Sequence, residues 1–468
     1  MKKLILPYIL LLMPVFAVAQ GQSFLLKDAF KKVDGVASSF RFNDHLGIMQ
    51  VKLNETSFEL IALDDKMSVL WRASFKGTGV ACGKFKGNIL AISDWSYNMG
   101  KGNINPWYAS LIDPATGKLI LQNQIFAQNA KHYEDLSAFF SSDGSDVKLI
   151  VRQAETNLGW LGAYKNKTED FTIISLNEKL QPAYLKPKIP DENFVSLAVN
   201  NAGDLFVMTT RDGNSLELRR YAQGSTEPSA PIVQACDQLG KPDLVAATNA
   251  ITPSETDRNI LYLSIAHNNQ KNVREIITAK FNFATQQSQA VTGVFTGKQK
   301  RALEKAYVPV NNAFPGVNLG AQKQQLQVKY FEAHDGKVIS VAAESFSTTV
   351  DVQTTYYEHG LIITCYDSDL KQLFQQVMLV GYTEAVPLTT GYSFGKNDLK
   401  VVSNKDFGSA YGQLDLSTGK WLKLVSLNTG GADTDQHIIW FGDHFIVPYL
   451  HRRGFGTRYN IDLGLNGY

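Results

Sequence analysis

Residues Leu326 to Ala342 read LQVKYFEAHDGKVISVA. Apolar and polar side chains alternate with a period of two on both sides of the pair Asp335-Gly336. Such alternation across an Asp-Gly turn is typical of a β-hairpin. The stretch therefore predicts two antiparallel strands joined by a tight turn.

The same pattern recurs along the chain. Units of an apolar strand, a turn with Asp, Asn or Gly, and a second alternating strand begin near Ser38, Gly79, Leu136, Phe194, Ala247, Leu326, Thr389 and His437. Their second strands start 43 to 78 residues apart. Repeats of about 40 to 60 residues made of strands are typical of propeller blades, which hold four strands each. The chain is therefore predicted to be all-β, a β-propeller of eight four-stranded blades.

A second hairpin type predicts the outer half of the blades. An Asp or Asn opens its turn, an apolar residue follows three positions later, and an aromatic residue follows seven positions later. It is found at Phe58–Trp71, Phe171–Tyr184 and Leu361–Phe374. Because Glu217 to Gln234 fits this pattern poorly, seven blades remain the alternative.

Two further turns carry a family resemblance. Asp113 to Lys118 and Asp415 to Lys420 both read D-x-x-T-G-K between apolar strands. This turn resembles the outer hairpin of quinoprotein-like and WD40-like β-propeller repeats, a class with cofactor-binding dehydrogenases and cofactor-free scaffolds of outer-membrane assembly. The tryptophan usual after such turns is displaced or absent, with Ile120 and Leu422 near its place. The resemblance implies the fold and transfers no active site.

The last unit predicts how the ring closes. After His437 to Tyr449 only one further strand remains, around Arg458 to Leu463, so the last blade lacks its outer strand. The segment Ser23 to Phe30 precedes the first unit and has a strand pattern. Pairing the two chain ends removes an open sheet edge, which would otherwise promote aggregation.

The N-terminus has the pattern of a secretory signal. Lys2 and Lys3 precede an apolar run that ends in Ala17-Val18-Ala19. The run is too short for a membrane span, so we expect cleavage after Ala19. The expected domains are a signal peptide at 1–19 and one propeller at 20–468. No thiol at the cleavage site offers a lipid anchor, which predicts a periplasmic or secreted protein.

The mature chain is expected to be electrically balanced. Removal of two lysines leaves 44 basic and 44 acidic side chains, which gives no basic surface for nucleic acid. No later segment predicts a membrane span. The three cysteines, Cys82, Cys236 and Cys365, are odd in number and widely scattered, so we expect all of them to be unpaired.

Connection lengths predict which face binds. The turns after the first and third strands are short, whereas several connections on the opposite face are long: 94–108, 153–170, 297–320, 344–359 and 448–458. Long loops on a rigid scaffold concentrate binding residues, and Trp, Tyr and Arg dominate binding energies. The candidate residues are Trp95, Tyr97, Trp107, Trp160, Tyr164, Tyr356, Tyr357, Arg452, Arg453 and Phe455.

No motif predicts a catalytic, metal or cofactor site. Gly391 to Gly395 matches G-x-S-x-G, but it lies along a strand, whereas a nucleophilic serine needs a strand-to-helix bend. His45 and His444 occupy equivalent turns of neighbouring blades and offer two ligands at most, fewer than zinc usually requires. The chain has no G-x-G-x-x-G, P-loop or C-x-x-C sequence.

Three functions are consistent with these observations. The favoured one is an exported interaction module that binds a protein, peptide or glycan on its long-loop face. The second is a propeller enzyme, a glycan lyase or hydrolase, with acid and base residues drawn from several blades. The third is a structural subunit of the cell envelope.

Overall fold

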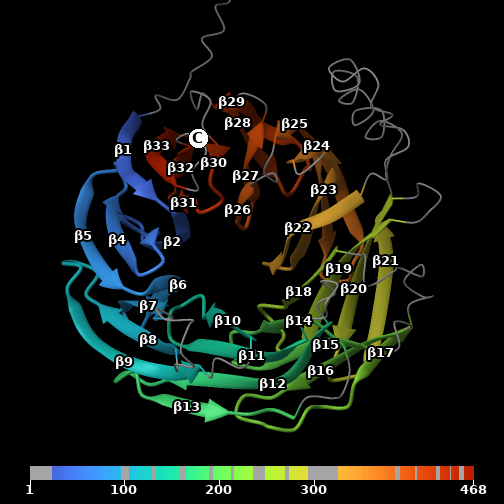
Figure 1. Cartoon of the computed structure of the whole chain (residues 1–468). Coiled ribbons are helices and arrows are strands. Elements are labelled where there is room, and N and C mark those ends of the chain that lie inside the picture. The colour runs from blue at the N-terminus through green and yellow to red at the C-terminus, as the bar shows by residue number, and fades with distance from the viewer. Residues whose placement is uncertain are drawn as a thin grey trace, which may run out of the picture.

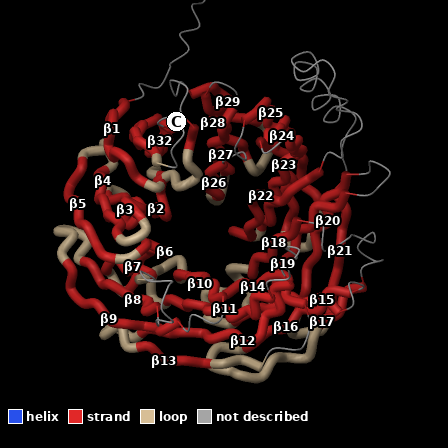
Figure 2. Tube along the Cα trace, in the orientation of Figure 1, coloured by secondary structure: helices blue, strands red, loops and turns tan. Residues whose placement is uncertain are grey.

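The computed structural model describes residues 24–95, 105–128, 133–157, 165–188, 193–211, 215–235, 248–268, 274–293, 325–350, 353–384, 390–405, 408–427, 433–442, 444–452 and 458–467. Strands are the regular elements of these ranges, and they form eight antiparallel sheets. The sheets are arranged in a ring around a central axis (Figure 1), and the strands account for most of the described trace (Figure 2). The predicted eight-bladed propeller is confirmed. Among the described residues no helix is long and apolar enough to cross a membrane.

Blades one to four each contain four consecutive strands, ordered from the channel to the rim. They are β2 (Gly35–Asn43), β3 (Leu46–Asn54), β4 (Ser57–Asp64) and β5 (Val69–Lys76); β6 (Thr78–Phe85), β7 (Asn88–Asp94), β8 (Asn105–Ile112) and β9 (Leu119–Gln128); β10 (Tyr133–Phe140), β11 (Val147–Asn157), β12 (Lys165–Leu176) and β13 (Pro182–Leu185); and β14 (Asn193–Val199), β15 (Leu205–Arg211), β16 (Ser215–Tyr221) and β17 (Ile232–Ala235).

Blades five to seven follow the same order, and blade eight contains both ends of the described chain. The strands are β18 (Thr248–Pro253), β19 (Ile260–Asn268), β20 (Arg274–Asn282) and β21 (Gln287–Gly293); β22 (Gln325–His334), β23 (Lys337–Val350), β24 (Gln353–Asp367) and β25 (Gln372–Glu384); β26 (Thr390–Phe394), β27 (Asp398–Lys405), β28 (Gly408–Asp415) and β29 (Trp421–Leu427); and β30 (Asp433–Thr434), β31 (Ile439–Trp440), β32 (His444–Arg452), β33 (Tyr459–Gly467) and β1 (Phe24–Val33).

The ring closes as predicted, through the N-terminal strand. β1 pairs antiparallel with β33, with Leu26 opposite Leu463 and Phe30 opposite Ile461. The order of blade eight is β1-β33-β32-β30, and the short β31 also pairs with β32. The innermost position of this blade is therefore shared by two short strands, and β1 takes the rim position.

The outer hairpin of blade four settles the blade count. β16 and β17 pair with Leu216 opposite Gln234 and Leu218 opposite Ile232. The segment between the two strands, residues 222–231, contains Gly224 and Pro228 and separates the strands further than a two-residue turn would. This insertion hides the hairpin pattern in the sequence, and the sheet pairing excludes the seven-blade alternative.

The predicted outer turns share one geometry. The carboxylate of Asp64 accepts hydrogen bonds from the backbone N–H groups of Lys66 (3.0 Å) and Ser68 (2.6 Å). The apolar residue three positions later, Met67, has φ 66° and is buried. Leu180 after Asn177 and Leu370 after Asp367 repeat this arrangement. The side chain of the opening Asp or Asn thus accepts hydrogen bonds from backbone N–H groups of the turn, and the apolar side chain three positions later is buried.

The D-x-x-T-G-K turns pack against an aromatic residue of the preceding blade. Gly117 has φ 70°, and a Cβ atom built on it would lie 2.4 Å from the Trp71 ring. The Trp71 indole N–H donates to the Pro114 carbonyl at 2.8 Å. Gly419 meets Phe374 in the same way. In both turns the aromatic ring that packs on the glycine therefore comes from the neighbouring blade.

The core consists of separate apolar clusters, one or two between each pair of neighbouring blades. Between blades one and two, for example, Ile48, Phe58 and Leu60 pack against Ile89 and Ala91. Equivalent clusters join every other pair around the ring, including blades eight and one. The blades are thus held by burial of apolar surface between sheets.

The order of the strands divides their connections between two faces of the disc. The side of the disc that carries the turns after the first and third strands of each blade is called the turn face. Asp44–His45 and Asp335–Gly336 are two of these turns. The connection face carries the links from second to third strands and from blade to blade.

Two connections predicted as loops are largely strand. β23 and β24 stay paired as far as Val350 and Gln353, so most of 344–359 forms a hairpin. β11 and β12 likewise pair as far as Asn157 and Lys165. The physical reason is composition, because the first segment is rich in Thr, Val and Tyr, which favour strands even where the alternation of apolar residues is lost. Paired strands therefore carry blades three and six further toward the connection face.

Candidate functional site

The two described tryptophans of the predicted binding face pack on the scaffold. The Trp95 ring lies 4.1 Å from the Tyr108 ring, and its indole N–H donates to the Ser93 hydroxyl at 3.2 Å. Trp107 does not lie in a loop but within β8, where it is 3% exposed and contacts Phe126. Trp107 is therefore a core residue, and Trp95 is only partly accessible.

Of the remaining predicted binding residues, three lie in described strands. Tyr356 and Tyr357 belong to β24, where they lie opposite Ser347 and Phe346 of β23. Arg452 ends β32, opposite Tyr459 of β33. The other candidates, Tyr97, Trp160, Tyr164, Arg453 and Phe455, lie outside the described residues.

A hollow of about 540 Å³ opens on the turn face beside the central channel. It lies where the inner parts of blades seven, eight and one meet. Its lining combines aromatic, charged and uncharged polar side chains: Phe40, Tyr392, Trp440 and Phe441; Arg41, Asp398, Lys400 and His437; Ser39, Ser393 and Gln436. Its volume is within the range of small-ligand sites. Sequence reasoning missed this hollow, because its walls come from opposite ends of the chain.

One wall of this hollow contains a largely buried lysine beside a carboxylate. Lys400 is only 13% exposed, and its amine lies 3.8 Å from Asp398. The Gln413 amide donates to the same Asp398 oxygen at 2.6 Å. Burial lowers the pKa of Lys400, Asp398 opposes this shift, and the positive charge of Arg41 lowers the pKa further. Arg41, Lys400 and Asp398 thus line the same aromatic hollow, and Lys400 is the kind of perturbed group that functional sites often contain.

A second titratable cluster adjoins Tyr392. The Tyr330 ring stacks on Tyr392 with centroids 4.5 Å apart, and its hydroxyl donates to Glu332. Burial raises the pKa of Glu332 to about 7; the charge of His334 opposes the shift, and that of Glu255 adds to it. His334 in turn contacts Glu255 of blade five at 2.6 Å. This cluster joins blades five, six and seven near the channel.

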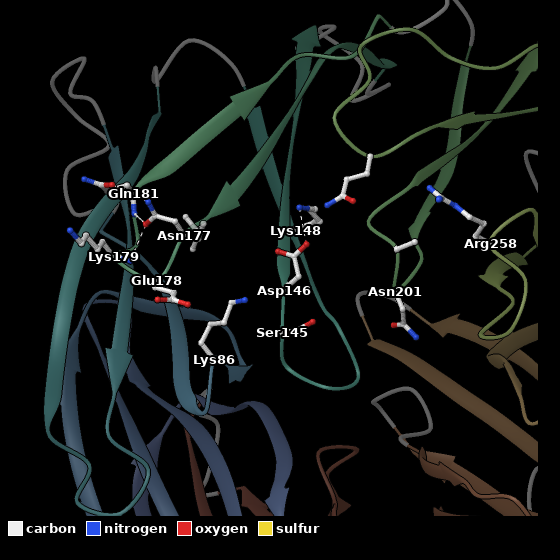
Figure 3. A pocket seen from close by; sticks show the side chains of 13 residues that line it. Lys86, Ser145, Asp146, Lys148, Asn177, Glu178, Lys179, Gln181, Asn201 and Arg258 are labelled. Carbon is white, nitrogen blue, oxygen red and sulfur yellow. Dashed lines mark hydrogen bonds and ion pairs between the residues drawn. The ribbon is translucent and has the colours of Figure 1, made fainter.

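A wider depression of about 970 Å³ lies on the same face over blades three and four. Figure 3 shows Lys86, the neighbouring pair Glu178 and Lys179, and Arg258 spread around it on three turns. Lys148 lies near its floor, where its amine contacts Asp146 at 2.9 Å and the Ser175 hydroxyl at 3.0 Å. The side chains that line this depression are mostly polar and lie far apart, as is usual for a solvated surface.

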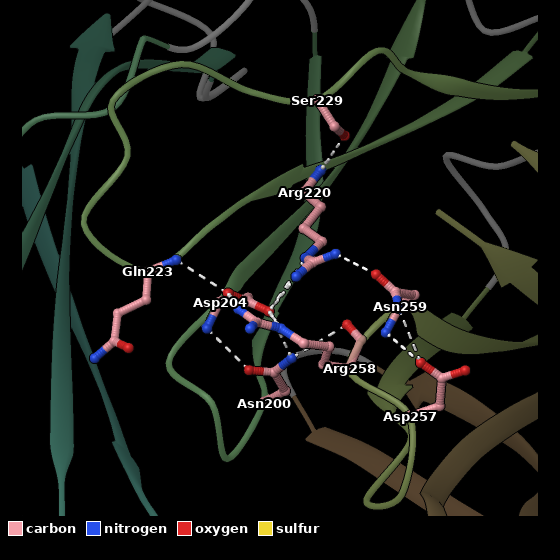
Figure 4. Close-up of polar contacts among 8 residues, drawn as sticks. All are labelled: Asn200, Asp204, Arg220, Gln223, Ser229, Asp257, Arg258 and Asn259. Atoms are coloured by element: carbon pink, nitrogen blue, oxygen red, sulfur yellow. Dashed lines mark hydrogen bonds and ion pairs between the residues drawn. The ribbon is translucent and has the colours of Figure 1, made fainter. Parts of the chain in front are cut away.

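The buried carboxylate of Asp204 ties blades four and five together beneath this depression. Arg220 and Arg258 donate to it at 2.8 Å and 2.7 Å, and the Gln223 backbone N–H donates at 3.0 Å. In Figure 4 the two guanidinium groups converge on Asp204, and Asn200 completes the cluster. Burial raises the pKa of Asp204, but the hydrogen bonds from Arg258, Asn200 and Gln223 and the charge of Arg220 bring it below the usual value. The arrangement is a structural tie between blades.

The motifs judged inactive take structural positions. Gly391 to Phe394 lie along β26, and a Cβ atom on Gly391 would meet Ile438 at 2.5 Å. His45 contacts Asp65 at 2.9 Å, and His444 stacks on Phe441. Within the described ranges no three His, Cys, Asp or Glu side chains are grouped to hold a metal ion.

The cysteines lead to a testable expectation. Cys82 and Cys365 are free and buried, and burial raises the pKa of both thiols, that of Cys365 to about 12. Cys236 lies outside the described residues. We expect three reactive thiols in the denatured, unreduced mature protein, whereas Cys82 and Cys365 react in the native protein only as fast as it unfolds. A denatured count below three in a thiol titration would contradict this.

The sequence matches no protein-family model and no curated protein. Among solved structures the chain is similar to BamB from Moraxella catarrhalis, at 10% identity over 96% of this chain and 97% of that chain, with a TM-score of 0.44. It is also similar to the WD40 domain of SCAP from fission yeast (10% identity, 95% and 98%, TM-score 0.45) and to the polysaccharide lyase Uly1 (8%, 83% and 89%, 0.42). At these values the similarities concern the fold, and no role is transferred from them.

Proposed function

We propose that this chain is an exported binding module that engages a protein, peptide or glycan through its connection face. The observation that supports the proposal is the one-sided construction of the disc. In blade six the strands β23, β24 and β25 are 13 to 15 residues long. The strands β2, β3 and β4 of blade one and β27 and β28 of blade seven are only 8 or 9 residues long. Paired strands give a protruding surface a rigid base, which lowers the entropy lost on binding.

Export is part of the proposal. The pattern of Lys2, Lys3 and the apolar run to Ala19 predicts a mature chain that begins at Gln20 in the periplasm or outside the cell. The binding partner is then expected in the same compartment.

The test uses variants on opposite faces. Tyr356→Ala and Trp160→Ala remove aromatic side chains from connection-face segments, whereas Lys396→Gln changes an exposed residue of a blade-seven turn. Trp95 is left intact because it packs on the scaffold. Each tagged protein is recovered from the native envelope fraction, and its affinity for the partner thus identified is then measured with the purified components.

We expect Tyr356→Ala and Trp160→Ala to weaken binding by roughly 1 to 4 kcal/mol each, the range of interface hot spots, with melting temperatures near that of the wild type. The Lys396→Gln variant should bind as the wild type does. Equal affinities for all four proteins, with the fold intact, would overturn the assignment of the face.

A further inference from the structure

We propose that the turn-face hollow between blades seven, eight and one is a second binding site, and that it takes an acidic saccharide. The site is independent of the connection face, because it lies at the opposite end of the channel. Three features carry the proposal: its concave aromatic lining, its excess of positive charge, and its uncharged polar groups.

The aromatic part suits the apolar face of a sugar ring. Phe40, Tyr392 and Trp440 come from three different blades and are all partly exposed. Two of them are held by neighbouring rings, since the centroids of Tyr392 and Tyr330 lie 4.5 Å apart and those of Trp440 and Phe445 lie 5.1 Å apart. Large rings that are partly buried and fixed in place offer contact area at little entropic cost.

The charged part suits a carboxylate. Arg41 and Lys400 line the hollow together with one carboxylate, Asp398. Asp398 also accepts from Gln413, which fixes its position beside Lys400. Arg41 lies 3.6 Å from Asp44, but that carboxylate is 85% exposed and outside the lining, so water screens the pair. The remaining positive charge can therefore form strong charge-assisted hydrogen bonds with a bound anion.

Uncharged polar groups complete the lining. Ser39, Ser393 and Gln436 supply hydroxyl and amide groups that both donate and accept hydrogen bonds, as sugar hydroxyls require. A peptide carboxylate would use the cations but would leave most of these groups to water. The combination therefore favours a saccharide that carries a carboxylate over a peptide terminus.

The experiment is calorimetric titration of the mature chain with an oligosaccharide of three uronate residues. The second probe is the same oligosaccharide with its carboxyl groups reduced to alcohols, and the third is a short peptide with a free C-terminal carboxylate. The variants are Arg41→Gln and Lys400→Gln, and the control is Lys396→Gln, which removes a lysine from the same face outside the hollow. Melting temperatures establish that each variant is folded.

We expect the uronate oligosaccharide to bind the wild type and the control equally. Binding should be about tenfold or more weaker for Arg41→Gln, for Lys400→Gln and for the reduced probe, because each change removes a charge-assisted hydrogen bond. Equal binding of the reduced and acidic probes, unchanged affinity in both variants, or binding of the peptide alone would overturn the proposal. None of these outcomes depends on the connection face, so they leave the proposed function to its own test.

Discussion

A chain that starts at Asp34, and so lacks β1, is expected not to fold into a stable propeller. Deletion exposes the whole edge of β33, whose backbone groups pair with β1 in the intact protein. It also removes Phe30 and Val33, which are 3% and 2% exposed, and uncovers the cluster that joins blades eight and one. An unpaired apolar edge promotes aggregation, and the lost burial costs several kcal/mol, roughly 1.5 to 3 kcal/mol for each large side chain.

β1 stabilises blade one as well as blade eight. The Arg72 guanidinium lies 4.8 Å from the centre of the Phe30 ring and donates to the Ala29 carbonyl at 2.9 Å. The strand therefore links the two blades at the point where the ring closes.

Two point variants within β1 provide the matched comparison. Phe30→Ala is expected to lower the free energy of unfolding by about 3 to 5 kcal/mol, because it empties a buried site. Phe24→Ala should change it by about 0.5 kcal/mol or less, since Phe24 is 59% exposed. Urea unfolding followed by circular dichroism measures both. Identical midpoints for the two variants would show that β1 does not contribute to the core.

Replacement of Asp204 by Ala is expected to be the most destabilising single polar substitution, at about 3 to 5 kcal/mol, because it leaves two arginines without their buried counter-charge. Asp204 is 0% exposed, and it accepts from Arg220, Arg258, Asn200 and Gln223. The comparison is Asp369→Asn. This change removes the ion pair between Asp369 and Lys280, in which the Asp369 side chain is 82% exposed. That variant should lose about 1 kcal/mol or less.

The pH dependence follows from the same carboxylate. The folded pKa of Asp204 lies below the unfolded value of about 3.9, so its stabilising contribution is complete above that value. It is lost as the pH falls through the lower folded pKa. In Asp204→Asn the unfolding free energy should therefore fall less steeply between about pH 4 and pH 2 than in the wild type. Parallel curves for the two proteins would contradict the assigned role.

The hairpins and turns that could be predicted from the sequence are those whose residues are neighbours in the chain. The hairpin at Asp335-Gly336 and the outer turns at Asp64 and Asp113 are visible because neighbouring residues alone satisfy the turn geometry. In the extended hairpin of β23 and β24 the polar residues hide the period of two, so the sequence predicts a loop where the structure has paired strands. The outer hairpin of blade four fits the sequence pattern poorly, because residues 222–231 separate its two strands.

The sequence by itself determined the all-β class, the eight repeats and the closure of the ring by β1, because these depend on periodicity, turn residues and strand count. Only the tertiary structure decided that Trp107 is core, that Arg220 and Arg258 meet at Asp204, and that Arg41 and Lys400 share one hollow. The pair Arg258–Asp204 and the lining of the hollow join residues of different blades. Their partners are set by how rigid sheets pack around the axis, and no local pattern in the chain encodes which side chains will then converge.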